Sequence, residues 1–162
     1  MIKTFNILAA TAAAVVSLPA AAQVMTPAEY VATAGASDLY EITASKVVLE
    51  TTQDPKIRQF AQMMIDQHSK STAEVKAAAA KSRVRVSAPK LTPLQQELVT
   101  ELRGEQGTAR DAAYIAQQRA SHGQALNVQK AYSLDGTAPA LKTAAGNIVP
   151  VVQQHIAMLG TM

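Results

Sequence analysis

The chain has 162 residues, a formal net charge of +3 at pH 7 and no cysteine. The lack of cysteine excludes a disulfide framework, a thiol nucleophile and thiolate metal ligands. The small positive charge gives no reason to expect a nucleic-acid partner. Tryptophan is absent and aromatic residues make up only 4% of the chain, a composition that favours helices over strands.

The N-terminal segment 1–22 has the pattern of an export signal. Lys3 forms a short positive region, residues 5–18 are apolar and rich in small side chains, and an A-x-A cleavage pattern ends at Ala22. Cleavage there would leave a mature domain at 23–162, which we expect to lie in the periplasm. The apolar run is shorter than the roughly 20 residues of a membrane-spanning helix. We therefore expect no transmembrane segment in the mature chain.

Helix start signals divide the mature chain. The segments at 26–29 (TPAE) and 92–95 (TPLQ) each combine a capping threonine, a proline and a Glu or Gln three residues after the threonine, which is a capping box. Asp54-Pro55 repeats the cap and the proline. Thr108 offers a weaker start, and the segment DGT at 135–137 indicates a turn between two helices.

These signals predict helices over residues 27–52, 55–82, 93–103, 108–133 and 138–160. Short turns join the first helix to the second and the fourth to the fifth, so each pair should form an antiparallel hairpin. The segment SRVRVSAPKLTP is expected to be extended. The predicted fold is therefore all-α, a four-helix bundle of two helical hairpins with a long central connection that contains a short helix.

A proline complicates the last helix of this prediction. Pro150 cannot donate a hydrogen bond to the carbonyl of Gly146, and its ring crowds that turn. A kink near residues 146–150 is expected, and two shorter helices are the alternative.

The chain contains three histidines, and helical periodicity places each on an apolar stripe. His68, His122 and His155 lie on three different long helices. A buried imidazole needs a hydrogen-bond partner, a metal or water, because an unpaired polar group in an apolar setting costs about 2–7 kcal/mol. The pattern is compatible with a metal site and also with hydrogen-bonded core histidines.

Counting residues from each turn gives the expected heights in the bundle. Glu41 lies about as far before the first turn as His68 lies after it, so the two side chains could meet. In the second hairpin the same count gives an axial mismatch of about 10 Å between His122 and His155. A distortion near Pro150 would be needed to bring all four residues together.

Several of these residues also have a purely structural interpretation. Asp38 and Glu41 flank the predicted apolar stripe of the first helix, and Glu41 could pair with a lysine at the rim. Met64 and Met158 could supply thioether ligands to copper or simply fill the core. Asp66 is predicted to be exposed, because it lies two residues from a core position.

Three segments carry a family resemblance, at residues 35–72, 109–126 and 141–159. In their order and spacing of Glu, Asp, Tyr, Pro and His they resemble domain of unknown function 4142, a family of exported bacterial proteins regarded as ferritin-like. The resemblance implies a ferritin-like fold and export, and it implies no settled activity. It also marks the following residues: Glu41, His68, His122, Pro150 and His155.

A di-iron carboxylate centre is not expected. Such a centre needs Glu-x-x-His on two helices, whereas the residues three before the histidines are Ile65, Arg119 and Val152. Three imidazoles and one carboxylate instead suit one divalent transition metal ion such as Zn, Cu, Ni or Fe. The predicted metal ligands are Glu41, His68, His122 and His155.

Two functions stay open at this point. The first is a periplasmic bundle with a mononuclear metal site that acts in metal handling or envelope stress. The second is a metal-free module whose core histidines are hydrogen-bonded and whose helices bind an envelope protein or a cell-wall component. An enzyme ranks third, because the sequence contains no Ser-His-Asp order and no phosphate-binding glycine loop.

Overall fold

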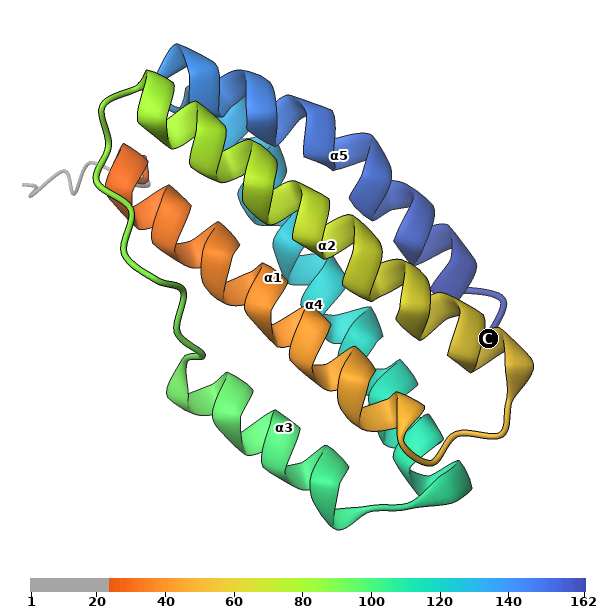
Figure 1. Ribbon diagram of the computed structural model, residues 1–162. Helices are drawn as coiled ribbons and strands as arrows, with labels where there is room; N and C mark the ends of the chain where they lie inside the picture. The colour runs from red at the N-terminus through yellow and green to blue at the C-terminus, as the bar shows by residue number, and fades with distance from the viewer. Residues whose placement is uncertain (1–23) are drawn as a thin grey trace, which may run out of the picture.

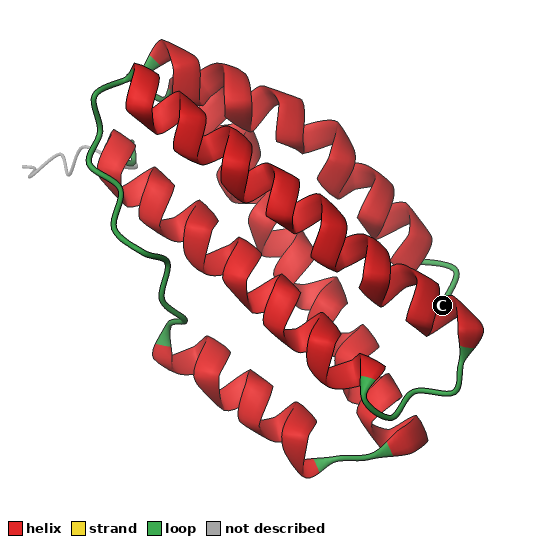
Figure 2. Cartoon of the chain, in the orientation of Figure 1, coloured by secondary structure: helices red, strands yellow, loops and turns green. Residues whose placement is uncertain are grey.

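The computed structural model describes residues 24–162, and the predicted export signal lies outside this range. The described part contains five helices and no strand (Figure 2). None of these helices is both long and apolar enough to cross a membrane. The helices are α1 (Pro27–Leu49), α2 (Pro55–Lys81), α3 (Pro93–Gly104), α4 (Gly107–Asp135) and α5 (Pro139–Leu159).

The predicted caps explain where three of the helices begin. Thr26 and Glu29 form a complete capping box at α1, and Thr92 and Gln95 form another at α3. At α2 the Asp54 side chain accepts hydrogen bonds from two backbone N–H groups of the first turn. Each of these side chains satisfies backbone donors that the first turn of a helix leaves unpaired.

The start of α4 differs slightly from the prediction. The helix begins at Gly107, which adopts a positive φ of 54°, and its N-cap Gln106 makes no side-chain hydrogen bond. Thr108 therefore lies inside the first turn and does not cap the helix. Glycine suits this position because a side chain is strained at positive φ.

The four long helices α1, α2, α4 and α5 form the bundle, and the short helix α3 lies outside it (Figure 1). α1 packs against α2 and α4 packs against α5, which are the two predicted hairpins. Contacts of α1 with α4 and of α2 with α5 close the bundle, so its order around the axis is α1, α2, α5, α4. The short α3 packs against α1 and α4. The predicted all-α four-helix bundle is confirmed.

The connection from α2 to α3 has no regular secondary structure, as expected. It runs along α1, where Pro89 lies against Gly35. A Cβ atom at Gly35 would lie 3.2 Å from Pro89 Cγ, so the missing side chain permits this close approach.

The apolar core consists of two clusters separated along the bundle axis. One cluster includes Tyr30 of α1 and Tyr132 of α4, which stack with ring centroids 3.9 Å apart. The other includes Tyr40 and Phe60 near the opposite end. Between the two clusters, each of the four long helices contributes buried polar side chains, namely Asp38, Glu41, His68, His122 and His155.

The expectation that Asp38 and Glu41 flank the buried stripe of α1, with Glu41 pairing with a lysine at the rim, is wrong. Asp38 is only 5% exposed and Glu41 only 1%. The apolar Leu39 and Ile42, by contrast, are only half-buried. The physical reason is that α1 packs against α2, α3 and α4 at once, so its buried surface is wider than one apolar stripe.

The last helix is continuous. α5 runs from Pro139 to Leu159 with Pro150 inside it, so the alternative of two shorter helices is wrong. Pro150 and Gly146 are both exposed. The carbonyl of Gly146, which loses its helical partner, therefore lies where water can hydrogen-bond to it.

Candidate metal centre

The three histidines converge in the polar layer between the two apolar clusters. His68 comes from α2, His122 from α4 and His155 from α5, and one nitrogen of each lies within 4.8 Å of the others. Their ring centroids are 5.2–5.7 Å apart. All three are buried. The predicted convergence of three imidazoles from three helices is therefore confirmed.

The predicted axial mismatch between His122 and His155 is wrong. α4 continues to Asp135 and α5 begins only at Pro139. The distance from His122 to the end of α4 and the distance from the start of α5 to His155 therefore differ by only about three residues, or about 4.5 Å of helix rise. The two rings can meet without a break at Pro150.

Each imidazole has one nitrogen beside an oxygen acceptor. Because these oxygens can only accept, the nitrogen beside each carries a hydrogen, and the other nitrogen of a neutral ring carries a lone pair. The hydrogen bonds are His68 Nδ1 to Asp38 Oδ1 (2.8 Å), His122 Nδ1 to the backbone carbonyl of Gln118 (2.9 Å) and His155 Nε2 to Gln67 Oε1 (2.7 Å).

Two of the remaining nitrogens face each other, and the third is buried without a partner. His122 Nε2 lies 3.1 Å from His155 Nδ1, and His68 Nε2 is buried without any hydrogen-bond partner. Two lone pairs at that separation repel unless a proton or a cation lies between them. Nitrogens bound to one tetrahedral zinc ion are about 3.3 Å apart, given Zn–N bonds of about 2.0–2.1 Å. The spacing of this pair therefore suits a shared metal ion.

The surroundings keep two of the rings neutral. Burial and the neighbouring His122 and His68 lower the pKa of His155 to about 3. Burial also lowers the pKa of His122, although the charge of Glu41 opposes it. Neutral imidazole is the form that binds metal, so these two rings are ready to act as ligands near pH 7.

His68 has the opposite electrostatic balance. Its burial alone would lower its pKa, but the hydrogen bond to Asp38 and the charges of Glu41 and Asp38 together raise it. A proton on Nε2 of His68 would have no acceptor in the described structure. A metal ion at this nitrogen would replace that unpaired proton.

Glu41 lies close to the three histidines, but on the side of the His122 ring that faces away from His155. Its Oε1 is 3.8 Å from Nδ1 of His122, and its Oε2 accepts a hydrogen bond from the side chain of Gln118. The structure therefore places Glu41 beside His122, outside the group of three facing nitrogens. Direct metal binding by Glu41 stays a prediction.

Sequence reasoning did not assign roles to three residues that orient the histidines. Asp38 binds His68 and also accepts a hydrogen bond from Thr72 at 3.0 Å. Because α1 ends at Leu49, Asp38 lies nearly as far before that end as His68 lies after the start of α2. A count from the true helix end would have identified Asp38. The other two residues, for which no such signal exists, are Gln67 and Gln118.

An aromatic ring closes one end of the site. The centroid of Phe60 lies 6.4 Å from that of His122 and 6.3 Å from that of His155. Met64 is fully buried in the same apolar cluster, and Met158 packs against that cluster half-buried. Apolar walls of this kind exclude water and strengthen electrostatic interactions inside the site.

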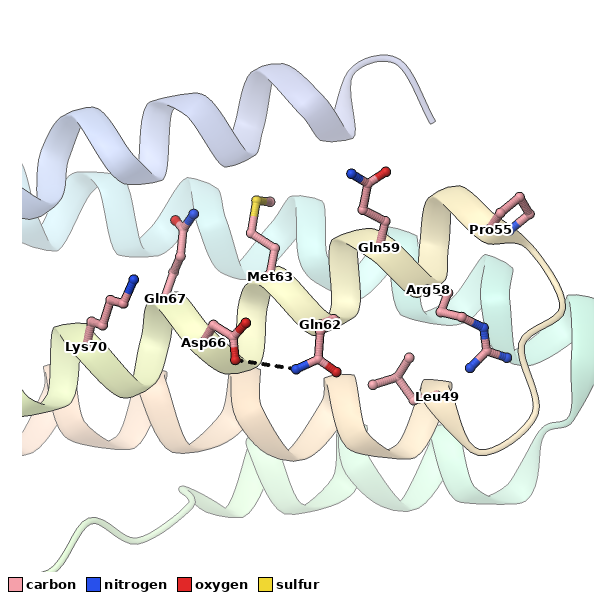
Figure 3. Close-up of a pocket in the computed structure, with 9 residues that line it drawn as sticks. All are labelled: Leu49, Pro55, Arg58, Gln59, Gln62, Met63, Asp66, Gln67 and Lys70. Carbon is pink, nitrogen blue, oxygen red and sulfur yellow. Dashed lines mark hydrogen bonds between the residues drawn. The ribbon is translucent and has the colours of Figure 1, made fainter.

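The outer face of α2 has a wide groove that meets the site only at Gln67. Figure 3 shows Gln59, Met63 and Gln67 pointing from α2 toward α5. Asp66 lies on the exposed side of α2 and accepts a hydrogen bond from Gln62 at 3.3 Å, so its predicted exposure is confirmed. Asp66 is the one carboxylate in its lining and no histidine lines it, so the groove holds no second group of metal-binding residues.

Comparisons with known proteins agree with this fold. The crystal structure of a predicted secreted protein, DUF305, from Streptomyces coelicolor is similar with a TM-score of 0.67, covering 83% of this chain and 88% of that chain at 15% identity. At this identity the likeness concerns the fold, which is of the ferritin-like helical type. No curated protein sequence matches the chain. The family model described as domain of unknown function (DUF4142) matches residues 11–162, and the chain therefore belongs to the DUF4142 family.

Proposed function

We propose that this protein is a periplasmic metal-binding bundle that holds one divalent transition metal ion. The ligands in this proposal are His68 Nε2, His122 Nε2 and His155 Nδ1. The observation that carries it is the meeting of three buried imidazole nitrogens, one of them without a partner and two of them 3.1 Å apart. Zn, Cu, Ni and Fe ions all accept imidazole ligands.

The hydrogen bonds around the rings support this assignment. Metal-binding histidines commonly donate their other N–H to a carboxylate or a carbonyl, which fixes the tautomer and the ring orientation. Asp38, the Gln118 carbonyl and Gln67 make these contacts here. Glu41 adds negative charge next to His122. The ligand set proposed here is the three histidines, and the Glu41→Gln variant below distinguishes this charge role from the direct ligation predicted from the sequence. We propose a role in metal handling in the periplasm for such a site.

A metal-free interaction module is the second candidate function. If the Gln67 amide were turned by half a rotation, its NH₂ group would donate to Nε2 of His155, and Nδ1 of His155 would then donate to Nε2 of His122. The two rings would thus be satisfied without a metal. This arrangement leaves His68 Nε2 unpaired. The metal site accounts for all three nitrogens, and for that reason we favour it.

Isothermal titration of metal-free protein with Zn²⁺ or Cu²⁺ tests the proposal. We expect one ion per chain, and His68→Ala and His155→Ala should each weaken binding by more than about 100-fold, since losing an outer partner alone costs about 10- to 100-fold. Glu41→Gln should weaken binding by only about tenfold if its role is electrostatic. Asp66→Asn, which removes an exposed carboxylate two residues from His68, is the matched control.

Two results would contradict the proposal. Unchanged metal stoichiometry and affinity in both His68→Ala and His155→Ala would show that these histidines do not bind the ion. Natively purified protein without metal by elemental analysis, together with no rise in the unfolding temperature on adding Zn²⁺ or Cu²⁺, would favour the metal-free module. Circular dichroism of each variant, and His68→Gln as a less disruptive substitution, separate loss of binding from loss of folding.

A further inference from the structure

We propose that the ion in this site keeps one coordination position open, and that a small ligand from solvent reaches this position through a pocket between α2 and α5. The ligand class is a small oxygen or nitrogen donor of the size of water, hydroxide or azide. This inference rests on the proposed function, because it requires that the three histidines hold an ion.

The number of protein ligands leads to an open position. Zinc and related ions take four or more ligands, and sites with three protein ligands keep the next position for water or another exogenous group. Among the described residues, the only carboxylates buried near the three rings are those of Asp38 and Glu41. Asp38 is bonded to His68 and Thr72, and Glu41 lies on the far edge of the His122 ring.

The opposite side of the bundle also has a pocket, of about 710 Å³ between α1, α3 and α4, but none of the three histidines lines it. Between α1 and α4 the Glu41 carboxylate accepts a hydrogen bond from Gln118, and α3 packs across the outside of these two helices. Figure 1 shows α3 lying along α1, away from α5. A ligand in that pocket would not border any of the three histidines, whereas the pocket between α2 and α5 borders two of them.

A pocket of about 320 Å³ opens between α2 and α5, next to the site. His68 and His155 both line it, whereas His122 lies behind them. A water molecule occupies about 30 Å³ in the liquid, so the pocket has room for a small ligand with its hydrating water. The pocket borders two of the three proposed ligands and therefore leads to the metal position.

Polar groups from both helices surround the mouth of this pocket. Glu74 of α2 accepts a hydrogen bond from Asn147 of α5 at 2.9 Å, and Val151 is 37% exposed beside it. Ser71 lines the opposite wall and is half-buried. Larger side chains can therefore be introduced into both walls of the pocket, at Ser71 and Val151, without altering the apolar core.

Cobalt substitution followed by azide titration tests this inference. Co²⁺ reports changes in its coordination through its visible absorption spectrum, and azide is a small nitrogen donor. We expect azide to change the spectrum of the Co²⁺-loaded protein saturably. Val151→Trp and Ser71→Trp should each weaken azide binding by about tenfold or more, which is about 1.4 kcal/mol of binding free energy. Neither substitution should change the affinity for Co²⁺. Leu134→Trp, at an exposed position that does not line the pocket, is the control.

The outcomes separate this inference from the proposed function. If Co²⁺ binds but azide leaves its spectrum unchanged, the open position is refuted and the three-histidine site stands. If azide binds equally well in both pocket variants, the route between α2 and α5 is refuted. If Co²⁺ and the other ions fail to bind, the proposed function itself fails, and this inference fails with it.

Discussion

Each histidine of the site is oriented by an oxygen from a different residue. The carboxylate of Asp38 gives the strongest of these contacts, because a hydrogen bond to an ionised group is about twice as strong as one between neutral groups. It directs Nδ1 of His68 toward α1 and leaves Nε2 buried without a hydrogen-bond partner, available to a metal ion. The orientation of one ligand therefore depends on a residue that does not itself bind the metal.

Replacing Asp38 with asparagine tests this role. Asp38→Asn keeps the shape of the side chain but removes its charge, so we expect Zn²⁺ affinity to fall by about 10- to 100-fold in calorimetric titration. In the metal-free protein the pKa of His68 should also fall, since the hydrogen bond and the charge of Asp38 both raise it. An NMR titration of the histidine ring protons measures that pKa.

The control for this substitution is Asp66→Asn on the exposed side of α2. It removes the same charge without touching His68. If Asp38→Asn leaves both the metal affinity and the pKa of His68 unchanged, then Asp38 does not orient the ring.

At the scale of helices, sequence signals located most elements accurately because their caps are local. A capping box joins residues three positions apart, so its effect can be read without knowing the rest of the fold. The end of α1 carries no comparable signal. The prediction placed it at residue 52, whereas the helix ends at Leu49. That small difference decided which carboxylate, Asp38 or Glu41, was matched in height with His68.

Pro150 gives a test of how tightly helix geometry controls the site. Its side chain is exposed within a continuous helix. Proline in a helix interior costs about 3 kcal/mol relative to alanine, and part of this is offset because proline restricts the unfolded chain by about 0.4–1 kcal/mol. We expect Pro150→Ala to stabilise the metal-free protein by about 2–2.6 kcal/mol in urea unfolding.

The same variant should bind Zn²⁺ as tightly as the unmodified protein, because the turn at Pro150 is not needed to bring His155 to His122. Ala157→Ser, a conservative change at another exposed position of α5, serves as the control. Weaker metal binding by Pro150→Ala, or a loss of stability, would mean instead that the proline sets the position of His155.

At the scale of the whole molecule, a polar layer divides the core into two apolar clusters. Burial of polar groups opposes folding unless they are hydrogen-bonded or bound to a metal. In this layer most groups are paired, but His68 Nε2 and Gln118 Oε1 are not. The stability of the metal-free bundle should therefore depend on the protonation of this layer.

Acid should destabilise the metal-free protein through His155. In the unfolded chain its pKa is near 6.5, whereas burial and the neighbouring histidines lower it to about 3 in the folded state. Between these values the unfolded chain holds a proton that the folded chain lacks, so stability falls as the pH falls from about 6.5 toward 3, by at most about 1.4 kcal/mol per pH unit for one histidine. The lowered pKa of His122 acts in the same direction.

His68 acts in the opposite direction. Its pKa is raised in the folded state, so its contribution is complete below pH 6.5 and is lost as the pH rises through its folded value. Urea unfolding between about pH 4 and 8 in the presence of a chelator measures the combined effect. His155→Phe should lose less stability on acidification than the unmodified protein. Identical slopes for the two proteins would show that His155 does not titrate as described.

The sequence by itself determined the all-helical fold, the two hairpins and the inward position of the three histidines. These features depend on caps, turns and helical periodicity, which act over a few residues. The tertiary structure alone decided that His122 and His155 lie at one height, that Asp38 pairs with His68 and that Gln67 reaches His155 from α2. Such contacts depend on the relative height and rotation of packed helices, and an error of two or three residues at a helix end is enough to change them.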